Sequence, residues 1–415
     1  MSKKTFIIII TIFSTIALSL FAVAYFISQK SGGEVTTTEA LVDFLPFGGV
    51  PEKPSTITDF ILGGSENGDD GEIIITGPEI VLPKLRKIST TEVSGAAILG
   101  LGSSTTIRYT EKVSGHVYET NIERGNLKRI SNTTIPKTQE VIFANNGQET
   151  INRYLRDDGV TIESFSMKIP QNVEDEQDTE STFLPENIGQ LITSPDYEKI
   201  FYIRTSSSGS IGTISNPDGS RKNQILESPF NEWLAFWPNL KEIILTTKAS
   251  SRIPGFAYSL NINNSTFTKI LGNINGLTTL MSPDGKFILY NSSDNRNISL
   301  YLYNLDNKNH EKIALDTLPE KCVWGVNSEN IYCGIPSIVS LGEYPDEWYQ
   351  GLTSFSDDIW KINTQTGFID LLSIPEDVEI DGIDLINPIL SEDNKYLIFT
   401  NKKDDYLWLL NLNSI

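Results

Sequence analysis

The stretch MSPDGKFILYNSSDNRNISLYLYNLDN, from Met281 to Asn307, decides the fold of this chain. It opens with the turn Ser282-Pro283-Asp284-Gly285, in which proline presets φ, aspartate bonds back to its own backbone and glycine accepts a positive φ. Two runs of alternating apolar residues follow, KFILY and ISLYLYNL, and a polar turn separates them. This pattern predicts antiparallel strands that each place one face in a core.

Similar units recur along the chain at intervals of about 43 to 49 residues, with one wider interval near the end. Their turns lie near residues 103, 146, 195, 238, 283, 328 and 392. A period of roughly 40 to 50 residues with several short strands per unit is typical of a β-propeller. Seven turns predict an all-β, seven-bladed β-propeller over residues 82–415. Six or eight blades are the alternatives, because the turns WPN at Trp237 and NSEN at Asn327 depart from the pattern.

The last unit lacks an outer strand. Most units end in a short strand such as FTKIL from Phe267, but the last one stops with the chain at Ile415. The sequence KLRKIS, Lys84–Ser89, has the same character and belongs to no preceding unit. We therefore expect residues 84–89 to pair with the last blade and close the ring, which removes a free sheet edge. The alternative is one more strand of the linker.

The turn motif resembles that of PD40 or TolB-like members of the WD40-like propeller superfamily. The residues that carry the resemblance are Ser194, Pro195, Asp196, Ser282, Pro283, Asp284 and Gly285, with Ser391-Glu392-Asp393 as a degenerate copy. The whole chain also resembles membrane-anchored, propeller-bearing envelope proteins of bacteria, whose function is uncharacterised. The resemblance implies a fold and a surface for binding, and no enzyme activity.

The first 27 residues predict a short cytoplasmic stub and a transmembrane signal anchor. Residues 6–27 carry no charge, and at 1.5 Å per residue they span about 33 Å, enough to cross a bilayer core. Because Lys3 and Lys4 precede them, the N-terminus is expected in the cytoplasm and the propeller outside the cytoplasmic membrane. The alternative is a signal peptide cleaved after Ala24, which also exports the chain.

Composition limits the partners and cofactors. Residues 28–81 are rich in glycine, proline and acidic residues, which predicts a flexible linker. The formal net charge of −20 argues against nucleic acid as a partner. With two histidines and two cysteines, we expect neither a metal site nor a cofactor.

The two cysteines lie in KCVWGVNSENIYC. If Asn327-Ser328 forms a two-residue turn, Cys322 and Cys333 face each other on adjacent strands. A location outside the cytoplasm favours a structural disulfide. Two free buried thiols are the alternative.

A long insertion, from Ile335 to Asp358, supplies the candidate binding residues. They are aromatic and acidic side chains, namely Tyr344, Asp346, Glu347, Trp348 and Tyr349. Aromatic residues beside polar ones are typical of interaction hot spots and suit sugar or cationic ligands. The alternative is that Trp348 and Tyr349 fold back and cap the propeller.

No sequence motif points to catalysis. The chain has no G-x-S-x-G, and its paired carboxylates are not placed around one pocket by any pattern, so we predict no catalytic residue and no enzyme. We expect an interaction or scaffolding module of the cell envelope, with another envelope protein or an envelope polymer as its partner. The alternative is a carbohydrate-binding or carbohydrate-active propeller. That alternative predicts clustered aromatics and at least two facing carboxylates in the central funnel.

Overall fold

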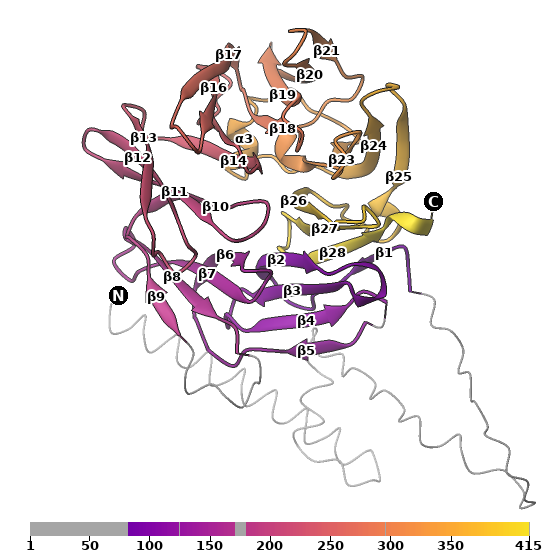
Figure 1. The fold of residues 1–415 in the computed structure, drawn as a ribbon. Coiled ribbons are helices and arrows are strands. Elements are labelled where there is room, and N and C mark those ends of the chain that lie inside the picture. Colours follow the sequence, from indigo (N-terminus) through magenta and orange to yellow (C-terminus); the bar gives the residue numbers. More distant parts are fainter. Residues whose placement is uncertain (1–81, 124, 171–179, 295, 415) are drawn as a thin grey trace, which may run out of the picture. The chain divides into compact units, whose positions relative to one another are not determined.

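The described part of the chain is a ring of seven sheets. The computed structural model describes residues 82–123, 125–170, 180–294 and 296–414. These residues form seven four-stranded antiparallel sheets, which follow one another around a ring from indigo to yellow (Figure 1). Each sheet is one blade of a β-propeller, so the predicted fold and blade number are confirmed.

The strands of each blade follow in chain order from the ring centre outward, except in the last blade. They are, in blade 1, β2 (Val93–Leu99), β3 (Thr106–Glu111), β4 (Val117–Asn121) and β5 (Leu127–Arg129); in blade 2, β6 (Thr138–Ala144), β7 (Glu149–Leu155), β8 (Ile162–Lys168) and β9 (Ser181–Phe183); in blade 3, β10 (Ile188–Thr193), β11 (Ile200–Ser206), β12 (Gly209–Ser215) and β13 (Asn223–Ser228); in blade 4, β14 (Trp233–Asn239), β15 (Glu242–Thr247), β16 (Pro254–Asn261) and β17 (Phe267–Asn275); in blade 5, β18 (Thr279–Met281), β19 (Phe287–Asp294), β20 (Asn297–Asn304) and β21 (His310–Lys312); in blade 6, β22 (Cys322–Trp324), β23 (Asn330–Pro336), β24 (Asp357–Asn363) and β25 (Ile369–Ser373); and in blade 7, β26 (Leu385–Leu390), β27 (Tyr396–Asn401), β28 (Leu407–Asn411) and β1 (Leu85–Lys87). The insertion of blade 6 contains the short helix α3 (Asp346–Tyr349), and 3-10 turns lie at Gly102–Ser104, Pro319–Lys321, Pro375–Asp377 and Leu412–Ser414.

Blade 7 joins two distant parts of the sequence. Strand β1 lies antiparallel to β28, with Leu85 opposite Leu410 and Lys87 opposite Trp408. Figure 1 shows indigo β1 beside yellow β28. Leu85 is buried in the cluster that contains Phe399 and Leu410. The outer edge of the last blade is therefore covered by residues from the start of the described chain.

The hydrophobic core is divided among the junctions between blades. Seven clusters of buried residues each contain side chains from two neighbouring blades, and an eighth lies under the insertion. At the junction of blades 5 and 6, for example, Leu289 and Leu300 pack with Trp324 and Ile331. Both faces of a blade are buried, which explains why the second strands read as nearly continuous apolar runs.

The serine and aspartate of the repeated turn bond to each other. The serine hydroxyl donates to the aspartate two residues later and accepts the N–H of the residue five positions later. In the SPDG turn, Ser282 Oγ lies 2.6 Å from Asp284 Oδ1 and 3.0 Å from the amide nitrogen of Phe287. The turns that begin at Ser194 and Ser391 repeat these bonds. The serine therefore recurs because its buried hydroxyl makes both of these hydrogen bonds.

The fourth residue of this turn has left-handed backbone geometry. Its φ is +74° at Gly285, +61° at Ser328, +56° at Asn394 and +60° at Tyr197. The NSEN sequence forms the same turn, because the N–H of Ser328 donates to Gly325 as that of Gly285 donates to Ser282, both at 2.9 Å. Glycine adopts this φ freely, whereas a residue with a Cβ loses about 1–2 kcal/mol. Tyr197 is therefore strained.

Within the described residues, no helix is both long and apolar enough to cross a membrane. The predicted signal anchor (1–27) and linker (28–81) lie outside them.

Candidate functional site

The two faces of the ring carry different loops. The turns between the first and second strands of every blade lie on one face, here called the turn face. The loops between second and third strands share the opposite face with the loops that join blades. The insertion connects β23 to β24 on this second face, which is here called the insertion face. The described chain enters at the turn face, where Asn411 donates to the Lys84 carbonyl and Leu412 to that of Lys395, both at 2.8 Å.

The insertion is held down by buried aromatic side chains. Tyr344 and Trp348 are only 1% and 3% exposed, and they pack with Phe355, Leu318 and Ile298. These two residues cannot offer an exposed aromatic surface to a partner. Of the two alternatives that the sequence left open for Trp348, its burial matches capping.

A buried lysine lies beneath Trp348. The Lys321 ammonium is 2.7 Å from Asp357 Oδ2 and 2.5 Å from Asp384 Oδ1, and none of the three side chains is exposed. It also lies 5.2 Å from the ring centres of both Trp348 and Phe355. The indole N–H of Trp348 donates to both Asp384 oxygens, at 3.2 and 3.1 Å. This network, defined by Lys321, Asp357, Asp384 and Trp348, is here called the buried ion cluster.

The two carboxylates of this cluster are electrostatically distinct. Burial raises the pKa of Asp357 to about 6, although Lys321 acts against the shift. Burial also acts to raise the pKa of Asp384, but Lys321 and hydrogen bonds from Phe355 and Trp348 outweigh it and lower that pKa. The cluster thus ties the insertion to the loops that precede blades 6 and 7 through charges that are sealed from solvent.

The other candidate residues of the insertion lie nearer the surface. Asp346 accepts the backbone N–H of Ser251 at 2.7 Å, which ties the insertion to blade 4, and Glu347 is half-buried. Tyr349 is 38% exposed and donates its hydroxyl to Glu320. Burial raises the pKa of Glu320, and burial together with Glu320 raises that of Tyr349 well above its usual value. Tyr349 also lines two cavities of the central channel.

The insertion exposes apolar residues that are not aromatic. Ile338, Leu341 and Leu352 are 80%, 62% and 72% exposed. The neighbouring loop, residues 374–384, adds exposed Val378 and Ile380. It touches the insertion where Ser354 and the Phe355 N–H donate to Asp384, each at 3.0 Å. Insertion and loop together contain no lysine or arginine and ten carboxylates, namely Glu343, Asp346, Glu347, Asp357, Asp358, Glu376, Asp377, Glu379, Asp381 and Asp384.

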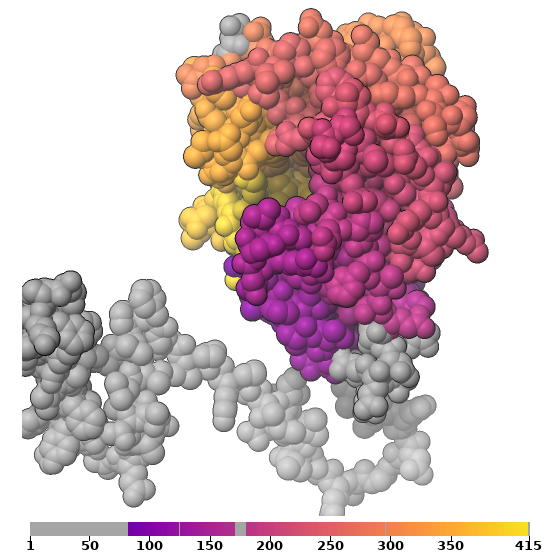
Figure 2. Space-filling model, turned by 90° about the vertical axis from the view of Figure 1, so that its left-hand side faces the viewer, coloured from indigo at the N-terminus to yellow at the C-terminus, as the bar shows by residue number. Residues whose placement is uncertain are grey.

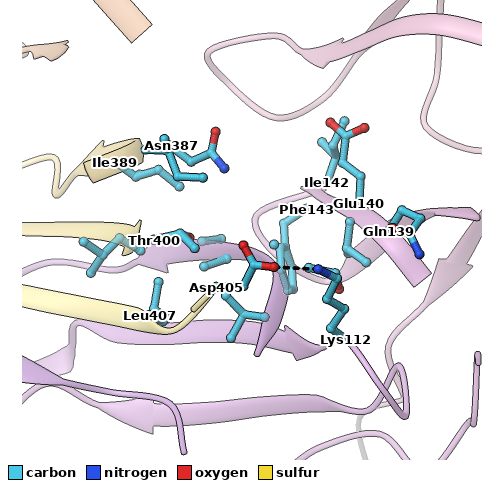
Figure 3. A pocket seen from close by; sticks show the side chains of 18 of the residues that line it. Lys112, Gln139, Glu140, Ile142, Phe143, Asn387, Ile389, Thr400, Asp405 and Leu407 are labelled. Atoms are coloured by element: carbon cyan, nitrogen blue, oxygen red, sulfur yellow. Dashed lines mark hydrogen bonds and ion pairs between the residues drawn. The ribbon is translucent and has the colours of Figure 1, made fainter. Parts of the chain in front are cut away.

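A cavity of about 570 Å³ follows the central channel beside blades 7, 1 and 2. Figure 2 shows a hollow bordered by indigo, magenta and yellow surfaces. In the close-up of Figure 3, Asn387 and Ile389 come from one side and Gln139 and Glu140 from the other. The cavity is therefore walled by the inner strands β26, β2 and β6.

The charged groups of this cavity are paired. Lys112 and Asp405 form an ion pair at 2.5 Å, drawn as a dashed line in Figure 3. Glu140 forms an ion pair with Arg153. The carbohydrate-binding or carbohydrate-active alternative predicted clustered aromatics and at least two facing carboxylates. The cavity is lined by two aromatic residues, Phe143 and Tyr197, and its carboxylates, Asp405 and Glu140, are each paired with a basic side chain. Among the described residues, no group of acidic, histidine or cysteine side chains is placed to hold a metal ion.

The two cysteines are joined. Cys322 in β22 lies directly opposite Cys333 in β23, and their sulfurs are 2.10 Å apart. The disulfide follows Lys321 directly, and β23 leads into the insertion. It therefore crosslinks the inner part of the blade that carries both the buried ion cluster and the insertion.

Comparison with solved structures finds likenesses at low sequence identity. The chain is 11% identical to an oligogalacturonate lyase from Vibrio parahaemolyticus, with 79% of this chain and 93% of that one covered and a TM-score of 0.49. It is 10% identical to the β-propeller domain of the Trilobed protease from Pyrococcus furiosus, over 77% and 95% of the two chains, with a TM-score of 0.48. For TolB from Acinetobacter baumannii the identity is 10%, the coverage 76% and 78%, and the TM-score 0.39.

At these identities the likeness concerns the fold alone. No protein-family model matches the chain, and no curated protein matches it either. The class of protein is a seven-bladed β-propeller, as its ring of seven four-stranded sheets shows, and its serine-aspartate turns resemble those of TolB-like propellers.

Sequence reasoning missed Lys321, Asp357 and Asp384. A weak signal was present, because Asp384 stands between Ile383 and Leu385 and Lys321 directly precedes the apolar strand β22. A charge inside an apolar run is often buried and paired. The identity of the partner, 63 positions away for Lys321 and Asp384, cannot be read from such a pattern.

Proposed function

We propose that this chain is a non-enzymatic interaction module of the cell envelope that binds a partner protein through its insertion face. The observation that carries the proposal is the insertion itself. Its aromatic residues and buried ion cluster fix it to the ring, while Ile338, Leu341 and Leu352 stay exposed. A fixed patch with exposed apolar side chains loses little conformational entropy on binding, which favours complex formation.

Charge narrows the chemistry of the partner. The insertion and the 374–384 loop are acidic and contain no basic residue, so a partner with basic and apolar side chains complements them. Nearby Lys402 and Lys403 already bind backbone carbonyls of Trp348 and Asp381. A membrane anchor at residues 6–27, with the propeller outside the cytoplasm, remains part of this proposal.

The experiment is an in-cell crosslinking pull-down of the full chain with a Leu341→Asp/Leu352→Asp variant. Its matched control is Leu101→Asp/Leu240→Asp, which changes two leucines on the turn face that are each 54% exposed. We expect the same proteins with the wild type and the control, and their loss with the insertion variant. Recovery of identical proteins by all three forms, or of no specific protein, would contradict the proposal. Trp348 is unsuitable for this test, because its replacement would release the insertion from the ring.

A further inference from the structure

Uncharged side chains line the channel cavity at bulges in three neighbouring inner strands. The strand pairing shifts between Val93 and Gly95 in β2, between Thr138 and Glu140 in β6, and between Ile386 and Ile389 in β26. Such bulges redirect side chains out of the regular alternation. Ser94, Gln139 and Asn387 lie at these three positions, and all three line the cavity.

The cavity offers hydrogen bonds but no free charge among its described lining residues. Its lysine is paired with Asp405 and its glutamate with Arg153. Two threonines, Thr193 and Thr400, add hydroxyl groups to the lining. Hydroxyls and carboxamides both donate and accept hydrogen bonds, so they match a ligand whose groups also do both. An ionic ligand would have to break an existing pair.

The strained tyrosine stands at the turn-face end of the same cavity. Tyr197 lines the cavity although its φ of +60° is the geometry that blade 5 gives to glycine and blade 7 to asparagine. Ser328 and Asn394 hold the equivalent position in blades 6 and 7, and their small side chains each bond to a neighbouring turn. Ser328 accepts the N–H of Asp284 at 3.1 Å, and Asn394 accepts that of Val326 at 3.0 Å. Backbone strain of this kind persists where the surrounding structure holds it, and it is enriched at functional sites.

We propose that the channel cavity binds an uncharged, hydroxyl-rich ligand, of the chemistry found in the neutral sugar units of a glycan. Ser94, Gln139 and Asn387 supply hydrogen bonds to its hydroxyls, and the ring of Tyr197 supplies an apolar face for its C–H groups. The volume of about 570 Å³ lies within the range of roughly 300–1,000 Å³ that is usual for small-ligand sites. The lining of the site includes no residue of the insertion or of the 374–384 loop, so the site stands or falls independently of the proposed protein interaction.

The test is isothermal titration of the full chain with two neutral tetrasaccharides, chitotetraose and maltotetraose. Tetragalacturonate serves as the charged comparison, and an uncharged decapeptide of glycine, serine and asparagine as the peptide comparison. Three variants are used: Tyr197→Asn, which takes the residue of blade 7, Gln139→Ala/Asn387→Gly, and the control Gln190→Ala. Gln190 is also an inner-strand amide beside a bulge, but it lines the other two cavities and not this one.

We expect at least one neutral tetrasaccharide to bind, with a loss of ten-fold or more in affinity for Tyr197→Asn and Gln139→Ala/Asn387→Gly. Gln190→Ala should bind like the wild type. The melting temperature of Tyr197→Asn should equal or exceed that of the wild type, which separates loss of the ligand from loss of the fold. Three results would overturn the proposal: no binding of either neutral tetrasaccharide at millimolar concentration, equal or tighter binding of tetragalacturonate or the peptide, or unchanged affinity in both cavity variants.

Discussion

Replacing Lys321 by methionine removes the cation of the buried ion cluster and leaves its two carboxylates without a counter-charge. Lys321 is fully buried, with Asp357 and Asp384 at 2.7 and 2.5 Å. Removing one partner of a buried ion pair lowers the free energy of unfolding by about 3–5 kcal/mol. Methionine keeps much of the side-chain volume, so the loss reports the charge rather than a cavity. Trp348 and Phe355 also lose the cation beside their rings, which adds to the loss.

The effect should depend on pH in a defined direction. Asp357 already has a folded-state pKa of about 6 in the presence of Lys321, above its ordinary value, because it is buried. Without Lys321, the folded-state pKa of Asp357 rises further and that of Asp384 rises as well, so the folded variant binds more protons than the folded wild type. The stability of the variant relative to the wild type then rises as the pH falls from 8 to 5. The difference from the wild type should therefore be largest at pH 8 and smaller at pH 5.

The assay is urea unfolding with the disulfide intact, at pH 8 and pH 5, and the control is Lys248→Met. Lys248 forms an ion pair with Glu232 at the same 2.7 Å, but the side chains are 56% and 65% exposed. An exposed pair contributes about 0–1 kcal/mol, so the control should change little at either pH. Equal losses in the two variants, or a loss for Lys321→Met that grows on acidification, would refute the reasoning.

Three further changes test the ring and its turns. Leu85→Ala should lower the free energy of unfolding by about 2–5 kcal/mol, because Leu85 is buried against β28. The control is Leu101→Ala, at an exposed position of blade 1. A melting temperature of Leu85→Ala no lower than that of the control would speak against closure of the ring by β1. Replacing both Cys322 and Cys333 by alanine should lower the free energy of unfolding in urea by about 3 kcal/mol, as expected for a disulfide that closes a loop of 11 residues. An unchanged midpoint would mean that the disulfide does not stabilise the fold. Ser282→Ala should lower the free energy of unfolding by about 1–3 kcal/mol, because it leaves the N–H of Phe287 without its hydrogen-bond partner. If the decrease is as small as that for replacing an exposed serine such as Ser208, the repeated serine does not have this role.

Much of the ring could be predicted from the sequence because its signals are local. The alternation of apolar residues in KFILY and ISLYLYNL spans a few positions, and so do the bonds that Ser282 makes within its own turn. The blade number follows from counting such units. The opposition of Cys322 and Cys333 follows from the length of one turn, and the role of the KLRKIS sequence follows from the missing strand of the last unit.

Only the tertiary structure decided which side chains of loops and turns are buried and which line a cavity. Trp348 belongs to a loop in the sequence, but it points inward because Lys321, Asp384 and Phe355 lie beneath it, each brought there by a different loop. Tyr197 follows a common turn motif, yet only the ring closure places it in a cavity walled by blades 7, 1 and 2. Whether a side chain is buried or free depends on the groups that face it across the fold. Those groups are distant in sequence, so no local pattern carries that information.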